Sequence, residues 1–289
     1  MSDTFVPQPG PGGRPIVRLI ARDGATADVS LHGGHVLSWT PAGESGSRLF
    51  LSERAEFADA TAIRGGVPVI FPQFADRGPY ARHGIARTAM WTLEAATRDT
   101  HGAATALLGL ADTDATRTRW PFAFRLRLAV TVGGDTLALA LTAENPGDEP
   151  FSATLALHTY LAVDHLDAAA LHGLAGARYL DSGDGGAERV EANEAVTFEG
   201  GGEIDRIYLG VGAAPLRLTD VGRGVQVAMH GFEDAVVWNP GAEGAAALAD
   251  LAPGDARCFV CVEAARIGRP VTLAPGDFWE GTCRLVASR

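Results

Sequence analysis

The sequence predicts an all-β protein, a large antiparallel sandwich or barrel. Short segments in which apolar and polar residues alternate recur along the chain, and Gly, Pro, Asp and Asn punctuate them. Helical periodicity is scarce. Only residues 165–179, which are rich in Ala, could pass for a helix, and Gly173 and Gly176 weaken that interpretation. Many short strands with turn signals between them are typical of sandwiches and barrels.

The expected strands follow one another along the chain, each an apolar or alternating run that ends at turn residues. Residues 133–135 (Gly-Gly-Asp) and 145–148 (Asn-Pro-Gly-Asp) have the composition that tight hairpin connections require. In chain order, the expected strands cover residues 16–21, 27–31, 36–39, 48–51, 122–132, 136–142, 152–163, 216–218, 224–230, 235–238, 258–264 and 279–286.

Length and composition favour one domain with a large core. The chain has 289 residues, of which 46% are hydrophobic, and no linker-like stretch divides it. All-β folds often exceed 200 residues as a single domain. We therefore expect one domain over residues 14–289. Residues 1–13 are polar and rich in Pro and Gly, which predicts a disordered N-terminal tail.

Targeting and redox signals indicate a cytoplasmic protein. The opening residues lack the basic and apolar regions of a signal peptide, and no apolar run approaches 18 residues, so we expect no membrane span. The three cysteines are an odd number, which argues against a disulfide scaffold. We expect a monomer.

The charge pattern excludes several classes of function. A formal net charge of −11 argues against broad binding to nucleic acid or to anionic membranes. All 24 basic residues are Arg, so a Schiff-base lysine, a P-loop lysine and a protein-kinase lysine are excluded. Arg64, Arg77, Arg82 and Arg87 nevertheless form a local basic cluster in the sequence, which could hold a phosphorylated small molecule.

Two neighbouring motifs predict a binding site for a small, oxygen-rich ligand. Residues 64–68 read Arg-Gly-Gly-Val-Pro, and residues 83–87 read His-Gly-Ile-Ala-Arg. Glycine permits close approach of a ligand to the backbone, and the arginine fork suits phosphate or sugar oxygens. The alternative is an ordinary Gly/Pro turn with solvated arginines.

His158 is a candidate site residue on an expected strand. One face of that strand carries Leu155, Leu157, Thr159, Leu161 and Val163, a good core face. The other face consists of Ala156, His158, Tyr160 and Ala162. Alanines beside a histidine and a tyrosine leave the space that the floor of a ligand groove needs. A structural histidine with satisfied hydrogen bonds is the alternative.

Two carboxylates complete the candidates. Glu263 interrupts an apolar strand, and a buried glutamate has a raised pKa that suits a general base near neutral pH. An outward-facing edge position is the other interpretation. Asp205 follows a Gly-rich loop and could bind ligand hydroxyls or cap the turn into the next strand.

The sequence holds no convincing metal or redox motif. Cys258 and Cys261 fit Cys-x-x-Cys, but residues three apart on a strand point to opposite faces, which predicts structural thiols. We therefore expect neither a metal nor another cofactor.

A set of motifs in order resembles a known family. These motifs match the hexose-6-phosphate mutarotases, also called glucose-6-phosphate 1-epimerases, of the aldose 1-epimerase (galactose mutarotase-like) superfamily. The resemblance covers about residues 14–289. It rests on residues 34–39, 63–68, 71–74, 83–87 with Trp91, 157–160, 205–208, 237–240 and 260–263.

The resemblance implies a β-supersandwich whose concave groove binds the sugar. It implies that His158 is the general acid and Glu263 the general base of anomer interconversion, with a hexose 6-phosphate as the partner and no cofactor. The substrate-binding positions that it implies are Arg64, Gln73, His83, Arg87 and Asp205, of which Arg64 and Arg87 are the expected phosphate partners.

Three other functions stay open from the sequence. The first is an epimerase that acts on unphosphorylated aldoses. The second is a non-catalytic carbohydrate-binding or sugar-sensing β domain. The third is a structural sandwich without a ligand, which leaves Glu263 within its strand unexplained.

Overall fold

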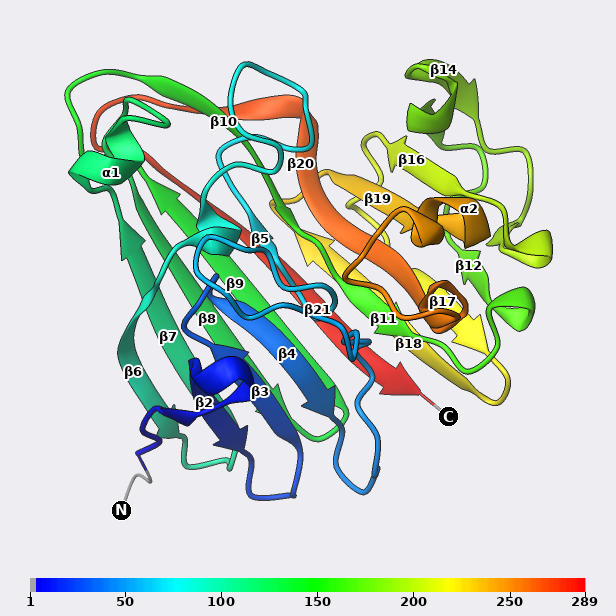
Figure 1. The fold of residues 1–289 in the computed structure, drawn as a ribbon, viewed down its shortest axis with the longest axis horizontal. Coiled ribbons are helices and arrows are strands. Elements are labelled where there is room, and N and C mark those ends of the chain that lie inside the picture. Colours follow the sequence, from blue (N-terminus) through cyan, green and yellow to red (C-terminus); the bar gives the residue numbers. More distant parts are fainter. Residues whose placement is uncertain (1–3, 289) are drawn as a thin grey trace.

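The computed structural model describes residues 4–288, and their strands form three antiparallel sheets (Figure 1). Two large sheets of eight and nine strands lie face to face, and a four-stranded sheet built from the N-terminal part of the chain packs at one end. This arrangement confirms the predicted all-β sandwich.

The four-stranded sheet contains the first segment that departs from the sequence prediction. Residues 4–13 were expected to be disordered, yet the backbone N–H of Phe5 donates to the carbonyl of Ala96, and Gln8 pairs with Ile16. The tail thus has backbone partners, while residues 1–3 lie outside the described residues. The strands are β1 (Gln8–Pro9), β2 (Pro15–Ile20), β3 (Thr26–Ser30) and β4 (His35–Thr40).

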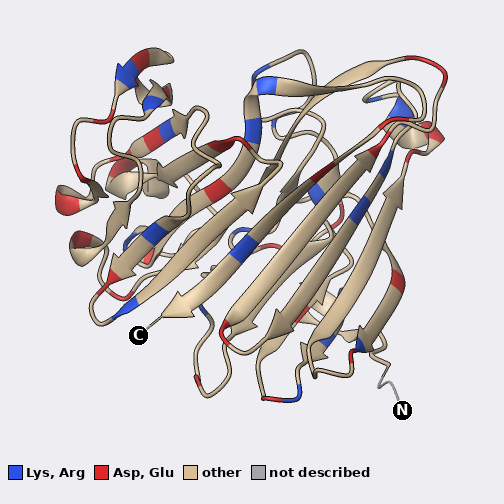
Figure 2. Ribbon diagram, turned by 180° about the vertical axis from the view of Figure 1, so that it is seen from behind, with Lys and Arg blue, Asp and Glu red and all other residues tan. Residues whose placement is uncertain are grey.

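The nine-stranded sheet forms the back of the molecule in Figure 1. Seen from behind in Figure 2, Arg and acidic segments are interspersed on it. In spatial order its strands are β15 (Ala195–Thr197), β12 (Ala170–His172), β17 (Leu216–Asp220), β18 (Arg223–His230), β21 (Phe278–Ser288), β9 (Thr136–Glu144), β8 (Arg125–Gly133), β7 (Ala104–Ala111) and β6 (Thr92–Arg98).

The eight-stranded sheet carries the candidate site residues of the second half of the chain. Its long central strand β20 pairs with β19 on one side, and with β10 and β11 on the other. In spatial order the strands are β14 (Ala187–Val190), β13 (Arg178–Asp181), β16 (Ile204–Tyr208), β19 (Asp234–Asn239), β20 (Phe259–Leu273), β10 (Phe151–Leu157) and β5 (Val69–Ile70), with β11 (Tyr160–Ala162) beyond the end of β10.

Helices are short and peripheral. The α-helices of the described residues are α1 (Asp114–Arg117) and α2 (Gly241–Ala246), and the remaining helical segments are single 3₁₀ turns. None of the helices in residues 4–288 has the length and apolar character needed to cross a bilayer.

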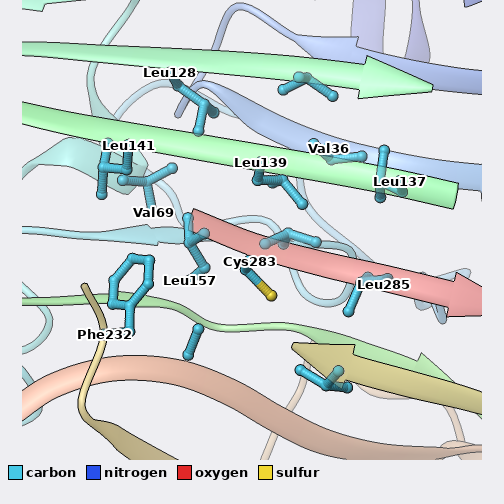
Figure 3. Close-up of a cluster of buried hydrophobic side chains, with 14 of the residues drawn as sticks. Val36, Val69, Leu128, Leu137, Leu139, Leu141, Leu157, Phe232, Cys283 and Leu285 are labelled. Atoms are coloured by element: carbon cyan, nitrogen blue, oxygen red, sulfur yellow. The ribbon is translucent and has the colours of Figure 1, made fainter. Parts of the chain in front are cut away.

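The main core lies between the two large sheets. Leu137, Leu139 and Leu141 of β9 meet Val69 of β5 and Leu157 of β10 in it (Figure 3). All five side chains are buried, and at roughly 25 cal/mol per Å² of buried apolar surface such a core dominates the stability of the fold.

Successive side chains of β20 alternate between the two faces of the eight-stranded sheet. Val260, Val262 and Ala264 join the main core, whereas Cys261 and Glu263 point to the opposite side. We call this second side, which faces away from the nine-stranded sheet, the site face. Other side chains on it are Ile70, Ala156, Tyr160, Ile207, Val236, Trp238 and Ala265.

Several expected strands differ from the observed ones. Strands β6 and β7 were missed because β6 is a largely exposed edge strand and β7 is rich in Ala, which has low strand propensity. Residues 48–51 make only isolated bridges, at Leu49 and Leu51. Residues 165–179, the possible helix, contain a 3₁₀ turn, β12 and the start of β13 instead.

Candidate active site

The sheet register brings His158 and Glu263 together. Leu157 pairs with Ala264, and Tyr160 pairs with Cys261, so the same antiparallel register continues across the break between β10 and β11. His158 lies in that break, opposite Glu263. Cross-strand neighbours of this kind place their side chains in contact on one face of a sheet.

The break itself orients the histidine. The backbone N–H of Thr159 donates to the carbonyl of Leu157 at 2.9 Å, a three-residue turn centred on His158. The N–H of His158 donates to the carbonyl of Pro68 at 2.9 Å, and the carbonyl of Thr159 accepts from Val262 at 3.0 Å. The chain is therefore anchored on both sides of the imidazole.

The two side chains form a buried pair. His158 Nε2 lies 3.2 Å from Glu263 Oε1, and the residues are 8% and 1% exposed. This burial is inconsistent with the edge position that the sequence had left open for Glu263. His158 Nδ1 and Glu263 Oε2 have no hydrogen-bond partner. Unpartnered buried polar atoms cost about 1–3 kcal/mol each, so the pair retains hydrogen-bonding capacity for a ligand.

Burial disfavours the charged form of both groups. It lowers the pKa of His158 well below the ordinary value, and the electrostatic interactions with His83, Arg87 and Arg64 act in the same direction. Burial, with the negative charge of Asp205, raises the pKa of Glu263 well above the ordinary value, while Arg87 opposes that rise. The proton shared by the pair is therefore favoured on Glu263, beside a neutral imidazole.

Aromatic side chains hold the imidazole in place. The Tyr160 ring stacks on the His158 ring at a centroid distance of 4.9 Å and an interplanar angle of 13°. Trp238 meets the same imidazole edge-on at 5.9 Å. Such contacts contribute about 0.5–1.5 kcal/mol beyond area burial and restrict the rotation of the ring.

The glycines before Val67 let the Arg64 loop pass close to the rest of the protein. Gly66 has a φ of +60°, and a Cβ on it would lie 2.2 Å from the carbonyl oxygen of Val36. A Cβ on Gly65 would lie 2.5 Å from the carbonyl oxygen of Phe50. Side chains are excluded at both positions, so the motif does more than form an ordinary turn.

Arg64 is already engaged by protein groups. Its Nε donates to Asp250 Oδ2 at 3.1 Å, and its Nη1 donates to Tyr160 Oη at 3.0 Å. Asp250 follows α2 in an Ala-rich stretch without strand or helix periodicity, and sequence reasoning missed it. Arg64 therefore connects this loop to the tyrosine that stacks on His158.

Arg87 differs from Arg64 in lacking an acidic partner. Its Nη2 donates to the carbonyl of Arg82 at 3.2 Å, its Nε is buried without a partner, and within residues 4–288 no carboxylate forms an ion pair with it. Burial, with the nearby charges of Arg64 and Arg82, lowers its pKa to about 10. Arg87 remains a cation at neutral pH and has free donors for an anion.

His83 lies beside His158. The two imidazoles are 5.7 Å apart, edge to face, and the backbone of His83 has a φ of +61°. The N–H of Ala75 donates to His83 Nδ1 at 3.3 Å, so the proton of the neutral ring is on Nε2. Burial, together with Arg87, Arg82 and Arg64, lowers the pKa of His83 to about 3. It is a neutral hydrogen-bond donor.

Asp205 lies on the site face of β16, directly across from Trp238 of β19. It is within a strand, not at a turn cap. Burial raises its pKa, whereas a hydrogen bond from Ser182 and the charges of Arg82 and Arg77 oppose that rise. Asp205 is therefore an acceptor on the far side of the site from Tyr160.

Gln73 is used differently from the sequence expectation of direct sugar binding. Its Nε2 donates to the carbonyls of Ala75 and Tyr80, and its Oε1 accepts from the N–H of Tyr80. The amide thus makes its hydrogen bonds within its own loop, because the donors of a buried amide need partners. Gln73 positions the segment that carries His83.

Comparison with known proteins identifies the family. Residues 15–286 match the family model described as aldose 1-epimerase. The chain belongs to this family. Relatives from Cenchrus ciliaris and Salmonella typhimurium carry the name "Putative glucose-6-phosphate 1-epimerase". The first is 34% identical over 289 residues, 96% of this chain and 86% of the relative. The second is 34% identical over 243 residues, which cover 82% of this chain and 78% of that relative.

Solved structures share the fold of this epimerase. A "putative mutarotase (YeaD)" from Salmonella typhimurium superposes with a TM-score of 0.89 at 28% identity and covers 99% of this chain and 94% of its own. A Synechocystis protein superposes with a TM-score of 0.78 at 20% identity. The match covers 100% of this chain and 98% of the Synechocystis chain. The predicted mutarotase-like fold is confirmed, and the protein is an isomerase with a small sugar as its substrate.

One group on the site face of the epimerase has the chemistry of a metal site. His158, Cys261 and Glu263 each offer a ligand atom, and the three atoms lie within 4.8 Å of one another. Cys258 is exposed and lies just before β20, at the end of the 3₁₀ turn Asp255–Arg257, whereas Cys261 is buried within β20; both are free thiols.

A separate cavity of about 420 Å³ lies beside α2. Its wall is mainly Ala and Leu with Arg54 and Arg257, and among the described residues that line it there is no His, Cys, Asp or Glu. Proton transfer needs groups that titrate near neutral pH, which the site face has and the described lining of this cavity lacks.

Proposed function

We propose that the protein interconverts the α and β anomers of a hexose 6-phosphate, with His158 and Glu263 as the acid/base pair. The observation that carries this proposal is their 3.2 Å contact on the site face. The oxygen of the anomeric hydroxyl and the ring oxygen are bonded to the same carbon. Two catalytic groups must therefore lie side by side to reach both oxygens at once.

The pair holds an exchangeable proton between Nε2 and Oε1. Burial favours this proton on Glu263, and the reaction proceeds from the form in which the proton has moved to His158 and Glu263 is a carboxylate. Glu263 removes the proton of the C1 hydroxyl while His158 donates its proton to the ring oxygen, and the bond between C1 and that oxygen breaks. Rotation about C1–C2 and the reverse proton transfers close the ring on the other face. The number of protons on the pair is the same before and after.

Arg87 supports a phosphorylated substrate. The C6 phosphate is attached next to the ring oxygen, on the side of the sugar that His158 must approach. Arg87 lies close enough to both catalytic groups to perturb their pKa values, and it lacks an ion-pair partner in the described part of the chain. Arginine binds phosphate through two parallel hydrogen bonds, each of which contributes about 1.5–3 kcal/mol when charged groups take part.

Arg64 has a different place in this proposal. Asp250 offsets its charge and Tyr160 accepts one of its hydrogen bonds, which leaves Nη2 to contact the sugar or its phosphate. His83 Nε2–H and the carboxylate of Asp205 then supply a donor and an acceptor for ring hydroxyls. This set recognises the polar substituents of a pyranose from both sides of the catalytic pair.

Saturation-transfer NMR on the anomers of glucose 6-phosphate and of glucose tests the proposal. We expect the protein to accelerate exchange of the phosphosugar anomers, with kcat/KM at least about tenfold higher than for the free sugar, because the Arg87 contacts are lost without phosphate. Equal kcat/KM values would indicate an epimerase of unphosphorylated aldoses. Binding without exchange would identify a sugar-binding domain and contradict the proposal.

A further inference from the structure

The site face holds a chemical group that mutarotation does not require, the thiol of Cys261. It projects from β20 two residues before Glu263, on the same face, and it pairs across the sheet with Tyr160. Cys261 is fully buried, while His158 retains 8% exposure. The histidine therefore connects this thiol to the surface of the site.

The spacing of the three side chains suits a tetrahedral metal. Two nitrogen or oxygen ligands about 2.0–2.1 Å from zinc lie about 3.3 Å apart, and a thiolate at about 2.3 Å lies slightly farther from each of them. His158 Nε2 and Glu263 Oε1 are 3.2 Å apart, and all three ligand atoms lie within 4.8 Å of one another. The histidine and the carboxylate need little movement, and the sulfur lies within 4.8 Å of both of their ligand atoms.

Two buried atoms at this point lack partners. Glu263 Oε2 and His158 Nδ1 form no hydrogen bond, although each belongs to a side chain at least nine-tenths buried. Native proteins leave few such atoms unpartnered, and an ion bound by the carboxylate also has Glu263 Oε2 available to it. His158 Nδ1 points away from Nε2 and does not face that ion. The unpartnered carboxylate oxygen indicates that the cluster has donor capacity beyond the contact between the imidazole and the carboxylate.

The local charge is compatible with a divalent cation. One thiolate and one carboxylate neutralise two positive charges, so a complex with Zn²⁺ has no net charge to interact with nearby Arg87. The donor set of nitrogen, sulfur and oxygen favours Zn²⁺, Co²⁺ or Cd²⁺, while Mg²⁺ prefers oxygen ligands and retains its water. Three protein ligands leave the fourth position to water.

We propose that His158, Cys261 and Glu263 form an inhibitory binding site for a thiophilic divalent cation such as Zn²⁺. The bound ion occupies the imidazole nitrogen and the carboxylate oxygen that the proposed mutarotation uses. The thiol proton and the proton shared by His158 and Glu263 both leave to solvent when the metal binds. Inhibition rests on the proposed function, whereas metal binding does not. A metal ion would thus switch the enzyme off at the atoms that perform the reaction.

Cobalt binding tests the site without any activity assay. Titration of the metal-free protein with Co²⁺ is expected to give one ion per chain with a thiolate-to-cobalt charge-transfer band in the near ultraviolet. Cys261→Ala removes the band, and Cys261→Val serves if the alanine variant is unfolded by thermal melting. Cys258→Ala, which removes the exposed thiol at the start of the same segment, retains the band. No band, or a band that depends on Cys258, overturns the proposal.

Zinc inhibition provides the second measurement. Each variant is compared with its own metal-free rate of anomer exchange, with EDTA to restore the rate and Mg²⁺ as the control ion. Loss of a group that only supports a metal ligand costs about 10–100-fold in affinity. Loss of the sulfur ligand is therefore expected to raise the half-inhibiting Zn²⁺ concentration at least about tenfold. Inhibition that is unchanged in the Cys261 variant overturns the inhibitory role. A cobalt band in a protein without exchange activity would contradict the proposed function alone.

Discussion

The Glu263→Gln variant is expected to lose about 10²–10⁴-fold in the catalysed rate of anomer exchange, the typical contribution of a positioned acid/base group. The amide has the shape of the carboxyl group but cannot accept the proton of the C1 hydroxyl. The fold should be retained, because the substitution removes a buried ionisable group whose charged form is unfavourable. Saturation-transfer NMR measures the rate, and thermal melting measures the stability.

A buried carboxylate elsewhere provides the matched control for this substitution. Glu191 is 4% exposed, and it accepts hydrogen bonds from Tyr208 and Arg206. The Glu191→Gln variant should lower the melting temperature and leave the rate of anomer exchange of the folded protein unchanged. An exchange rate of the Glu263→Gln variant equal to that of the unmodified protein would exclude Glu263 as the base.

Removal of Arg87 is expected to separate the phosphosugar from the free sugar. The Arg87→Ala variant should raise KM for glucose 6-phosphate by about 10–100-fold, the loss expected for one or two charge-assisted hydrogen bonds, with a much smaller change for glucose. The reason is that Arg87 lacks an acidic partner of its own in the described chain, so its donors are available to the phosphate. Steady-state kinetics on both sugars measures the difference.

Arg127 is a suitable control for the loss of one positive charge. It lies on β8 of the nine-stranded sheet and pairs with Glu94 at 3.0 Å, away from the site face. The Arg127→Ala variant should change KM for neither sugar by more than about twofold, because an exposed charge far from the substrate is screened by salt. Equal changes of KM for both sugars in the Arg87→Ala variant would show that Arg87 does not bind the phosphate.

The sequence predicted the faces of the site strand better than its continuity. Leu155, Leu157, Leu161 and Val163 join the main core as the alternation predicts. The break at His158 was not predictable, because it depends on hydrogen bonds to Pro68 and Val262 from other segments and on no local breaker residue. Side chains continue to alternate between the two faces beyond the break at His158, because β10 and β11 pair with β20 in the same register.

The partners of the arginines were beyond prediction from the sequence. Arg64 and Arg87 look alike in the Gly-rich motifs, yet Asp250, 186 positions after Arg64, engages only the first of them. Gln73 looked like a polar ligand-binding residue, and its amide instead satisfies the backbone of its own loop. Such distinctions depend on tertiary contacts, which the local pattern does not encode.

The contact between His158 and Glu263 could not be predicted from the local sequence pattern either. Each residue stood out because a polar side chain interrupted an apolar strand, but their pairing follows from the order of β5, β10 and β20 in the sheet. Resemblance to a family supplied the expected roles, and the register supplies a physical reason why the two groups meet.

A crystal structure of the Glu263→Gln variant with glucose 6-phosphate tests the central proposal most directly. We predict that the C1 hydroxyl lies within hydrogen-bond distance of the side chain at position 263. The ring oxygen should lie within that distance of His158 Nε2, and the phosphate should lie against Arg87. A sugar bound with its anomeric carbon away from His158, or bound in the cavity beside α2, would contradict it.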